Sequence, residues 1–389
     1  PRRSAAAMMP AASVVLLGGT IFGSPSEEPI RDGVVIVQDG TITAVGARGS
    51  IAIPPGVPSL DCSGLSIAAG FWNSHVHFFE RKWANAGEIP AAELARQLRD
   101  AFMRFGFTSV FDTGSAWANT RRIRDRVESG EVAGPRILST GEALVAPGSV
   151  PSERILSVLG TMSFPLSEVV DSAQAATASR KLLDEGVDGI KAHLQAPEFP
   201  RDAIPAVVSE AHRSGKPVFV HPANGADVLA TARAGVDVIL HTVPHSGPWD
   251  EATLAAMAER RVALTPTLTL WKWFLRHDRI STQEKIVDTA VGQLRAWVSR
   301  GGAVLFGTDL GAVEYDPSEE YVLMAAAGMS FRDILASLTT APAERFGGMG
   351  RIAKGAAADL VVFQGDPSSD IRSLASVRYT IRSGKIVFP

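Results

Sequence analysis

Four of the eight histidines in this chain end apolar segments. His75 and His77 lie at the end of the apolar segment 71–77. Because residues i and i+2 of a strand face the same side, both imidazoles can bind one ion. His221 and His241 each close a further apolar run. Packing does not explain such positions, because a buried polar group costs free energy unless it is paired. The pattern therefore indicates a metal site with imidazole ligands.

A carboxylate and a lysine end two more segments of this kind. Asp309 is expected on the last strand of a barrel, which neighbours the first when the barrel closes. Lys191 ends the strand before that of His221, and a divalent cation would repel its ammonium group. Lys191 therefore either points away or becomes a carbamate bridging two ions, which needs the neutral amine that burial favours. His193, two residues further on the same face, is a rival ligand, although we expect it to be a core residue or to support the ligands.

Composition narrows this chemistry. The single Cys62 excludes an internal disulfide framework and a multi-cysteine zinc site. With 38 Lys and Arg against 41 Asp and Glu, the chain has a net charge of −3 and no basic excess for nucleic acid. No apolar run reaches the roughly 18 residues of a membrane span. We expect a small-molecule substrate, and we leave both a monomer and a homo-oligomer open.

The first residues bear on the compartment. Arg2 and Arg3 precede small residues broken by Pro10, a pattern typical of a trimmed signal region or of a flexible tail over residues 1–13. One cysteine suits the cytosol without excluding export. A cytoplasmic and a periplasmic or secreted location both remain open.

Both ends of the chain carry strand signals. Asp39-Gly40 separates two β-rich runs and predicts a hairpin, and Ser383-Gly384 gives the same signal near the C-terminus. The 389 residues, 46% of them hydrophobic, can fill a large barrel and a small companion. We expect residues 14–66 and 355–389 to form one composite β-sandwich domain.

Between these ends, short β runs alternate with helical stretches, which predicts a parallel sheet. The expected strands end near His77, Asp112, Gly141, His193, His221, His241, Pro266 and Asp309, and amphipathic segments occupy residues 91–104, 169–185, 202–214 and 282–299. We predict a (β/α)₈ TIM barrel over residues 67–354, with its reactive groups at one face. An open doubly wound sheet is the alternative, but no Gly-x-Gly-x-x-Gly follows the first strand.

The combined set of motifs resembles the metal signature of the amidohydrolase superfamily, in particular its imidazolonepropionase-like and prolidase-like hydrolases. The residues that carry the resemblance are His75, His77, Lys191, His221, His241 and Asp309, with residues 39–42, 340–346 and 355–362. The resemblance covers nearly the whole chain. It implies a barrel with a composite β-sandwich that hydrolyses amide, other C–N or ester-like bonds at one or two divalent ions.

The resemblance also implies roles for single residues. His75, His77 and Asp309 would hold a buried ion, His221 and His241 a more exposed one, and carboxylated Lys191 and a hydroxide would bridge them. We expect two Zn²⁺ per chain, although Mn²⁺, Co²⁺ and Fe²⁺ use the same ligands.

Two positions depart from the family pattern. Asn73 stands where many relatives have Asp, which affects the support of the ligands. Residues 140–142 read Thr-Gly-Glu where dipeptidase-like relatives show Thr-Gly-Gly-His, so dipeptides are not favoured over other amides.

Asp309 and His241 are the candidate catalytic residues. The expected reaction cleaves an amide-type C–N bond of a peptide-like, N-acyl amino acid or cyclic amide substrate. A metal-bound hydroxide attacks, and Asp309 passes the proton to the leaving nitrogen. One alternative is a mononuclear hydrolase or deaminase of a cyclic amide, amidine or lactone with unmodified Lys191. Another is a catalytically silent binding protein on the same scaffold.

Aromatic residues in predicted loops suggest where the substrate lies. Trp83, Trp271 and Tyr315 could wall a pocket for a bulky apolar group, or instead cover the barrel or a subunit interface. Glu142 and His245 complete the candidate substrate contacts, His245 as a partner for a carboxylate.

Overall fold

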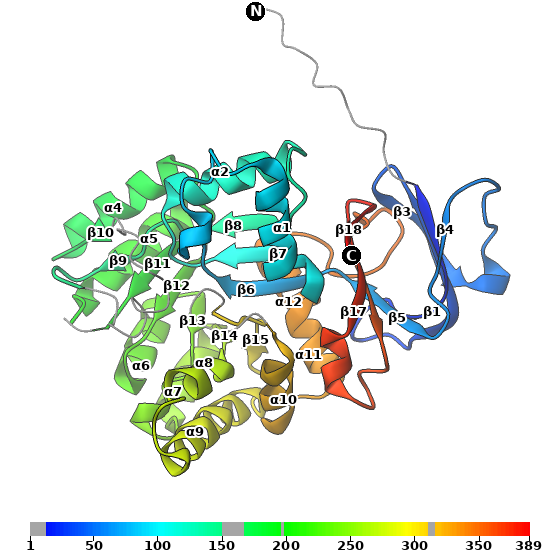
Figure 1. The fold of residues 1–389 in the computed structure, drawn as a ribbon. Helices are drawn as coiled ribbons and strands as arrows, with labels where there is room; N and C mark the ends of the chain where they lie inside the picture. Colours follow the sequence, from blue (N-terminus) through cyan, green and yellow to red (C-terminus); the bar gives the residue numbers. More distant parts are fainter. Residues whose placement is uncertain (1–12, 150–166, 196–197, 310–315) are drawn as a thin grey trace, which may run out of the picture.

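Eight parallel strands form a closed barrel in the computed structural model, which describes residues 13–149, 167–195, 198–309 and 316–389 (Figure 1). The strands are β6 (Phe71–Val76), β7 (Phe107–Asp112), β8 (Arg136–Ser139), β11 (Ile190–His193), β12 (Val218–His221), β13 (Val238–Leu240), β14 (Ala263–Thr265) and β15 (Ala303–Val304). β6–β8 pair in order, as do β11–β15. Backbone hydrogen bonds of 2.7 Å from Asp188 to Ser139 and from Ser74 to Phe306 join the two stretches.

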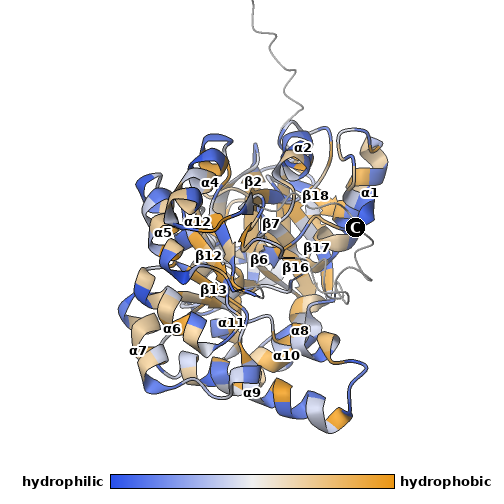
Figure 2. Ribbon diagram, turned by 90° about the vertical axis from the view of Figure 1, so that its left-hand side faces the viewer, coloured by the Kyte–Doolittle hydropathy of each residue, from blue (hydrophilic) through white to orange (hydrophobic). Residues whose placement is uncertain are grey.

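Helices surround this barrel and turn their hydrophilic sides outward (Figure 2). They are α1 (Ala91–Ala101), α2 (Trp117–Glu128), α4 (Ser172–Asp184), α5 (Ile204–Arg213), α6 (Gly225–Ala234), α7 (Glu251–Glu259), α8 (Leu268–Phe274), α9 (Ile280–Val298), α10 (Ser318–Ala326), α11 (Phe331–Leu338) and α12 (Thr340–Phe346). α1 shows why the helices are oriented in this way. It buries Leu94, Leu98 and Ala101, whose spacing of four and three residues places them in one apolar stripe facing the barrel. None of the described helices is both long and apolar enough to cross a membrane.

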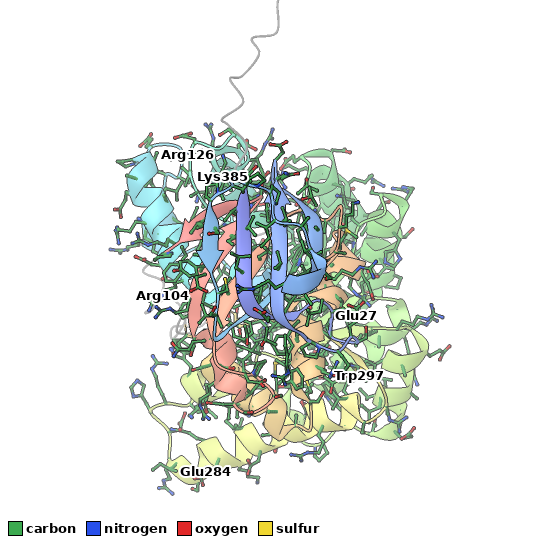
Figure 3. All side chains as sticks on the ribbon, turned by 90° about the vertical axis from the view of Figure 1, so that its right-hand side faces the viewer. Glu27, Arg104, Arg126, Glu284, Trp297 and Lys385 are labelled. Carbon is green, nitrogen blue, oxygen red and sulfur yellow. The ribbon has the colours of Figure 1, made fainter. Side chains whose placement is uncertain are left out.

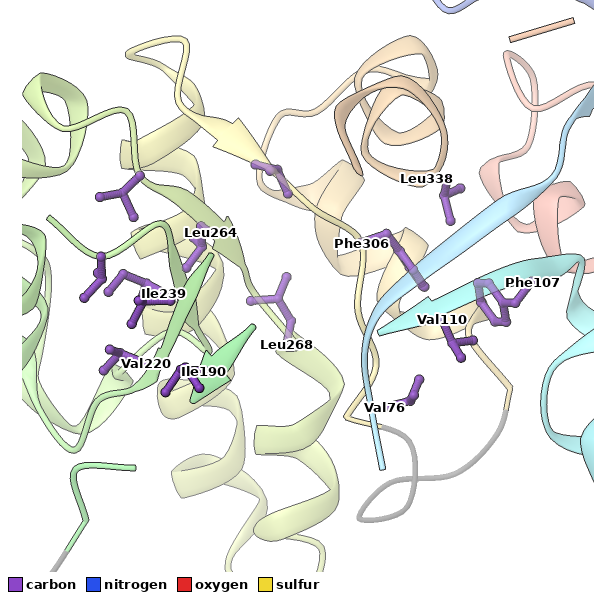
Figure 4. Close-up of a cluster of buried hydrophobic side chains, with 14 of the residues drawn as sticks. Val76, Phe107, Val110, Ile190, Val220, Ile239, Leu264, Leu268, Phe306 and Leu338 are labelled. Carbon is purple, nitrogen blue, oxygen red and sulfur yellow. The ribbon is translucent and has the colours of Figure 1, made fainter. Parts of the chain in front are cut away.

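The strands are buried on both faces because the helices cover the outside. Val220 and Ile239 face outward into the cluster between strands and helices (Figure 4), whereas Phe219 and Leu240 belong to a separate cluster inside the barrel. Alternation along β12 therefore puts His221 on the same side as Phe219. The interior of the barrel is apolar along the strands, and polar side chains lie at the carboxyl ends of the strands.

Both ends of the chain meet in one eight-stranded sheet, which lies against the barrel (Figure 3). Its strands are β1 (Val14–Phe22), β2 (Ile30–Gln38), β3 (Thr41–Ala47), β4 (Ser59–Asp61), β5 (Leu65–Ala69), β16 (Leu360–Gln364), β17 (Val377–Arg382) and β18 (Lys385–Phe388). β5 joins the two ends, because it pairs parallel with β1 and antiparallel with β16. Asp39 and Gly40 have φ of 52° and 73°, as a tight hairpin turn requires.

The predicted barrel with a composite β-sandwich is confirmed. Seven expected strand ends fall within two residues of the observed ones; the last paired strand, β15, instead ends at Val304, five residues before Asp309. The four expected helices correspond to α1, α4, α5 and α9, with short 3₁₀ turns completing the first and preceding the third. Sequence reasoning missed β9 (Leu144–Val145) and β10 (Ser167–Glu168), which extend the sheet beside β11. Residues 1–12 of the expected tail lie outside the described residues.

The close passage of Gly307 between Thr265 and His75 yields a stability prediction. A Cβ at Gly307 would lie 2.3 Å from Thr265 Cγ2 and 2.8 Å from His75 Cβ, well inside van der Waals contact. We expect Gly307→Ala to lower the free energy of unfolding by roughly 1–3 kcal/mol, as overpacking does, measured by chemical denaturation. Gly292→Ala in α9 is the matched control, because its Cβ meets nothing within 4 Å. Equal stability of Gly307→Ala and the wild type would contradict the tight packing.

Candidate metal centre

Two histidines and a carboxylate converge where the last barrel segment meets β6. Asp309 Oδ1 lies 2.9 Å from His77 Nε2 and 3.3 Å from His75 Nε2. All three residues are buried, and the backbone N–H of Asp309 donates to the His75 carbonyl over 2.9 Å. The closure of the barrel between its first and last segments thus brings these three groups together.

Further imidazoles extend this group into a row. The ring centroids of His75 and His241 are 4.7 Å apart, those of His241 and His221 4.4 Å, and those of His221 and His193 4.2 Å. Ligand atoms of His75, His241 and Asp309 all lie within 4.8 Å of one another. Four histidines from three different strand ends, with His193 beside them, therefore share one site.

The backbone turns His241 into this site. Leu240 faces the inside of the barrel, so plain alternation would send the next side chain outward. His241 instead has a φ of 67°, in the left-handed region, and its ring lies against those of His75 and His221. Asp309 is also left-handed, with a φ of 57°. Such conformations cost free energy and cluster at functional sites.

Lys191 approaches the same group from β11 and is only 4% exposed. A Cβ added to Gly114 would lie 3.6 Å from both Lys191 Nζ and His77 Cε1, so the glycine leaves room beside the amine. No hydrogen bond or ion pair of Lys191 Nζ occurs within the described part of the chain. Burial lowers the pKa of Lys191 to about 8, against the opposing effect of Asp309 and Asp112, which makes the neutral amine accessible.

The imidazoles are held in the form that binds metals. Burial lowers the pKa of His241 to about 4 and the pKa values of His75 and His221 well below their ordinary value, so these rings are neutral. Both ring nitrogens of His75 and Nδ1 of His77 are buried without a hydrogen-bond partner among the described residues. Buried polar atoms are rarely left so. Nitrogen and oxygen donors with unused lone pairs fit a divalent cation.

Sequence reasoning missed Asp112, which it placed only as a strand end. Its carboxylate accepts hydrogen bonds from the hydroxyls of Ser115, Thr120 and Ser139 at 2.6, 3.0 and 2.8 Å. It also lies 3.9 Å from His77 Nδ1, and it is fully buried. At this distance the carboxylate makes no hydrogen bond to the ring and acts on His77 through its negative charge. The one signal in the sequence is the group of hydroxyl residues that follows this strand end.

Asn73 joins the two segments that carry His75 and Asp309. Its Nδ2 donates to Thr308 Oγ1 over 2.8 Å, while its Oδ1 accepts from the backbone N–H groups of His75 and Thr308. An aspartate could not donate the first of these bonds. Asn73 therefore supports the positions of His75 and, through the neighbouring Thr308, of Asp309.

Two neutral side chains contact the other histidines. Gln195 Nε2 lies 2.9 Å from His221 Nε2, and Thr267 Oγ1 lies 2.5 Å from His241 Nδ1. Each partner engages one ring nitrogen and leaves the other available. Sequence reasoning gave neither residue a role.

The candidate substrate contacts are divided. Trp271 and His245 lie together, with ring centroids 5.4 Å apart, and Trp271 Nε1 donates to Thr242 Oγ1 next to His241. Trp83 is instead fully buried against Phe78 and Phe102, so it has no exposed surface for a substrate. Glu142 is half-buried and accepts from the backbone N–H of Trp117 at the start of α2. Tyr315 lies outside the described residues.

The chain is similar to known proteins over most of its length. The pattern of the Amidohydrolase family matches residues 66–387. Ochratoxinase of Aspergillus niger is 20% identical over 92% of this chain and 83% of its own length. Among solved structures, an Xaa-Pro dipeptidase with bound methionine has a TM-score of 0.81 at 23% identity, covering 96% of this chain and 99% of that one.

A second solved structure, a prolidase complexed with N-methylphosphonate-L-proline, has a TM-score of 0.78 at 26% identity, with coverage of 96% of this chain and 99% of that one. These likenesses extend over the barrel and the sheet together. The family match spans β6 to β18, and thus every strand end that carries His75, Lys191, His221, His241 or Asp309. The chain belongs to the Amidohydrolase family.

Proposed function

We propose that this protein is a metal-dependent hydrolase of an amide-type C–N bond in a peptide-like, N-acyl amino acid or cyclic amide substrate. The observation that carries the proposal is the convergence of buried, neutral imidazoles with Asp309 and the buried Lys191 at one end of the barrel. In barrels of this type the reactive groups lie at the carboxyl ends of the strands. Membership of the Amidohydrolase family supports the same reaction class.

The proposed centre holds two ions, with Zn²⁺ as the first candidate. His75, His77 and Asp309 would hold the buried ion, and their mutual distances of 2.9 and 3.3 Å support this assignment. His221 and His241 would hold the second ion. Gln195 contacts Nε2 of His221 and Thr267 contacts Nδ1 of His241. Nδ1 of His221 and Nε2 of His241 are then left for the ion, which supports this assignment. Lys191, converted to a carbamate by carbon dioxide, would bridge the two; its burial and the space beside Gly114 support this role.

The residues of the chain divide the chemical work. A bound divalent cation polarises the substrate carbonyl and lowers the pKa of water. Asp309 takes the proton of the attacking water and delivers it to the amine nitrogen as the C–N bond breaks. A ring nitrogen of His241 lies within 4.8 Å of a carboxylate oxygen of Asp309. The neutral imidazole of His241 would therefore lie next to the bond that is cleaved. The buried surroundings exclude bulk water and strengthen these electrostatic interactions.

Substrate contacts are proposed at the edge of the site. Trp271 and His245 follow the ends of β14 and β13, and Trp271 bonds Thr242, the residue after His241. There an aromatic face and an imidazole can receive an acyl group and a carboxylate. Glu142 is a weaker candidate, because one of its oxygens already caps α2. The complexed prolidase among the structural neighbours supports testing N-acyl amino acids and dipeptides first.

A mononuclear centre with unmodified Lys191 is the second candidate. One observation favours it: the cluster with ligand atoms close enough to hold an ion comprises His75, His241 and Asp309, in the part of the chain that the structure describes. In that case His221 would keep its bond to Gln195 without binding metal.

Metal content distinguishes the two centres. With two ions, the protein loaded with Zn²⁺ retains close to two equivalents per chain by elemental analysis, and Lys191→Met loses at least one equivalent together with hydrolysis of an amide panel. Reloading of the chelated protein then requires bicarbonate as a source of carbon dioxide. Lys181→Met, at an exposed position of α4, is the control and should retain both ions. One retained equivalent in the wild type and in Lys191→Met would overturn the bridging role.

Asp309→Asn tests the proton transfer. The amide oxygen of asparagine can still bind a cation but does not accept a proton near neutral pH, so most of the metal should remain. We expect kcat for amide hydrolysis to fall on the order of 10²–10⁴-fold, the usual contribution of a general acid–base group. Metal analysis and steady-state kinetics on the same preparation check both parts. A metal-loaded variant with unchanged kcat would rule out the role of Asp309.

A further inference from the structure

Thr267 has an unusual backbone conformation next to the metal centre. Its φ of 45° and ψ of 53° are left-handed, and among the described non-glycine residues with positive φ it is the one β-branched side chain. Left-handed conformations cost such residues on the order of 1–3 kcal/mol and persist only where the surroundings enforce them. The strain therefore calls for surrounding contacts that hold this residue.

The hydroxyl of Thr267 is used for His241 rather than for the helix that follows. Thr267 is the N-cap residue of α8, a position at which a threonine side chain ordinarily accepts a backbone N–H of the first turn. Its side chain makes no such bond, and its Oγ1 lies 2.5 Å from His241 Nδ1. The first turn of α8 must find its acceptor elsewhere.

Glu320, on α10, supplies that acceptor. Its Oε1 accepts from the backbone N–H of Leu268 at 2.8 Å, and its Oε2 accepts from the backbone N–H and the hydroxyl of Thr269 at 2.8 and 2.7 Å. The residue is fully buried, so these donors take the place of water around its carboxylate. A side chain about fifty positions away in the sequence thus caps α8 in place of Thr267.

The same short helix is tied to the strand end a second time. Trp271 Nε1 donates to Thr242 Oγ1 over 2.9 Å. Two consecutive residues after β13, His241 and Thr242, are therefore held by α8, and the beginning of α8 is held by Glu320. Displacing the first turn of α8 would move both contacts.

We propose that Glu320 is a positioning residue of the metal centre, which caps α8 so that the Thr267 hydroxyl is free to orient His241. With Nδ1–H donated to Thr267 Oγ1, the lone pair stays on Nε2, the nitrogen left for a cation. This inference rests on the role of His241 as a metal ligand under the proposed function. It adds two residues, Thr267 and Glu320, on which the affinity for metal depends.

Thr267→Val and Thr267→Ser test the contact with His241. Valine keeps the branched shape without the hydroxyl, and serine keeps the hydroxyl without the branch. We expect Thr267→Val to weaken Zn²⁺ binding about 10–100-fold, the usual effect of removing a partner that orients a ligand, and Thr267→Ser to restore most of the affinity. Competition with a chromogenic chelator measures the affinity, and thermal unfolding of the apoprotein measures stability. Affinity of Thr267→Val equal to the wild type would overturn the proposal.

The role of Glu320 is tested by a double-mutant cycle. If Glu320 acts through Thr267, adding Glu320→Ala to Thr267→Val weakens Zn²⁺ binding little further, because the contact is already lost. Fully additive losses would show a merely structural cap and overturn the proposal. Glu320→Gln, which keeps one carbonyl acceptor, replaces Glu320→Ala under the same criterion if the latter does not fold. Glu319→Gln is the matched control: it lies on the same helix, is partly exposed and pairs with Lys272.

These measurements separate this proposal from the function on which it rests. A wild-type protein without affinity for Zn²⁺, Mn²⁺, Co²⁺ or Fe²⁺ would overturn the metal-dependent function and, with it, the role of His241. Tight binding by the wild type with unchanged binding by Thr267→Val would overturn the positioning role alone. The readout is metal affinity rather than turnover, so the outcome does not depend on having found the substrate.

Discussion

The rest of the structure depends on one constraint: buried imidazole nitrogens must be held in place although the described protein groups give them no hydrogen bond. Both ring nitrogens of His75 and Nδ1 of His77 are buried and have no hydrogen-bond partner among the residues that the structure describes. Desolvation keeps these rings neutral, and unused lone pairs in a low-dielectric site bind a cation much more strongly than in water. The barrel, its helices and the sheet beside β6 provide the rigid surroundings that hold this arrangement against its cost.

Part of the free-energy cost of this arrangement lies in strained backbone conformations. The backbones of His241, Thr267 and Asp309 are all in the left-handed region, and the three residues follow the barrel strands β13, β14 and β15. At such a residue the alternation of an extended strand is broken, so a side chain can be redirected toward the centre. The hydrogen bonds from the Asp309 N–H to the His75 carbonyl, from His241 Nδ1 to Thr267 Oγ1 and from the first turn of α8 to Glu320 hold these conformations.

The two sides of the centre are supported differently. Asp112, a buried carboxylate with three hydroxyl donors, stands beside His77, whereas neutral groups, Gln195 and Thr267, contact His221 and His241. At 3.9 Å from His77 Nδ1, Asp112 acts on this imidazole through its negative charge rather than through a hydrogen bond. A charged group therefore stands beside one side of the centre, and neutral hydrogen-bonding groups hold the other. Trp271, paired with His245, bonds Thr242 next to His241 in the chain, where the proposed substrate would arrive.

Local sequence determined the barrel, the shared sheet and the positions of His75, His77, His221, His241, Lys191 and Asp309, because an apolar strand that ends in a polar residue is a pattern of neighbouring residues. Tertiary packing decided what those residues contact. The turn of His241 toward the centre, the pairing of Thr267 with His241 and of Glu320 with α8, and the burial of Trp83 depend on contacts between distant elements. No local pattern encodes these contacts, since the partners come from different strands and helices and meet only after the barrel has closed.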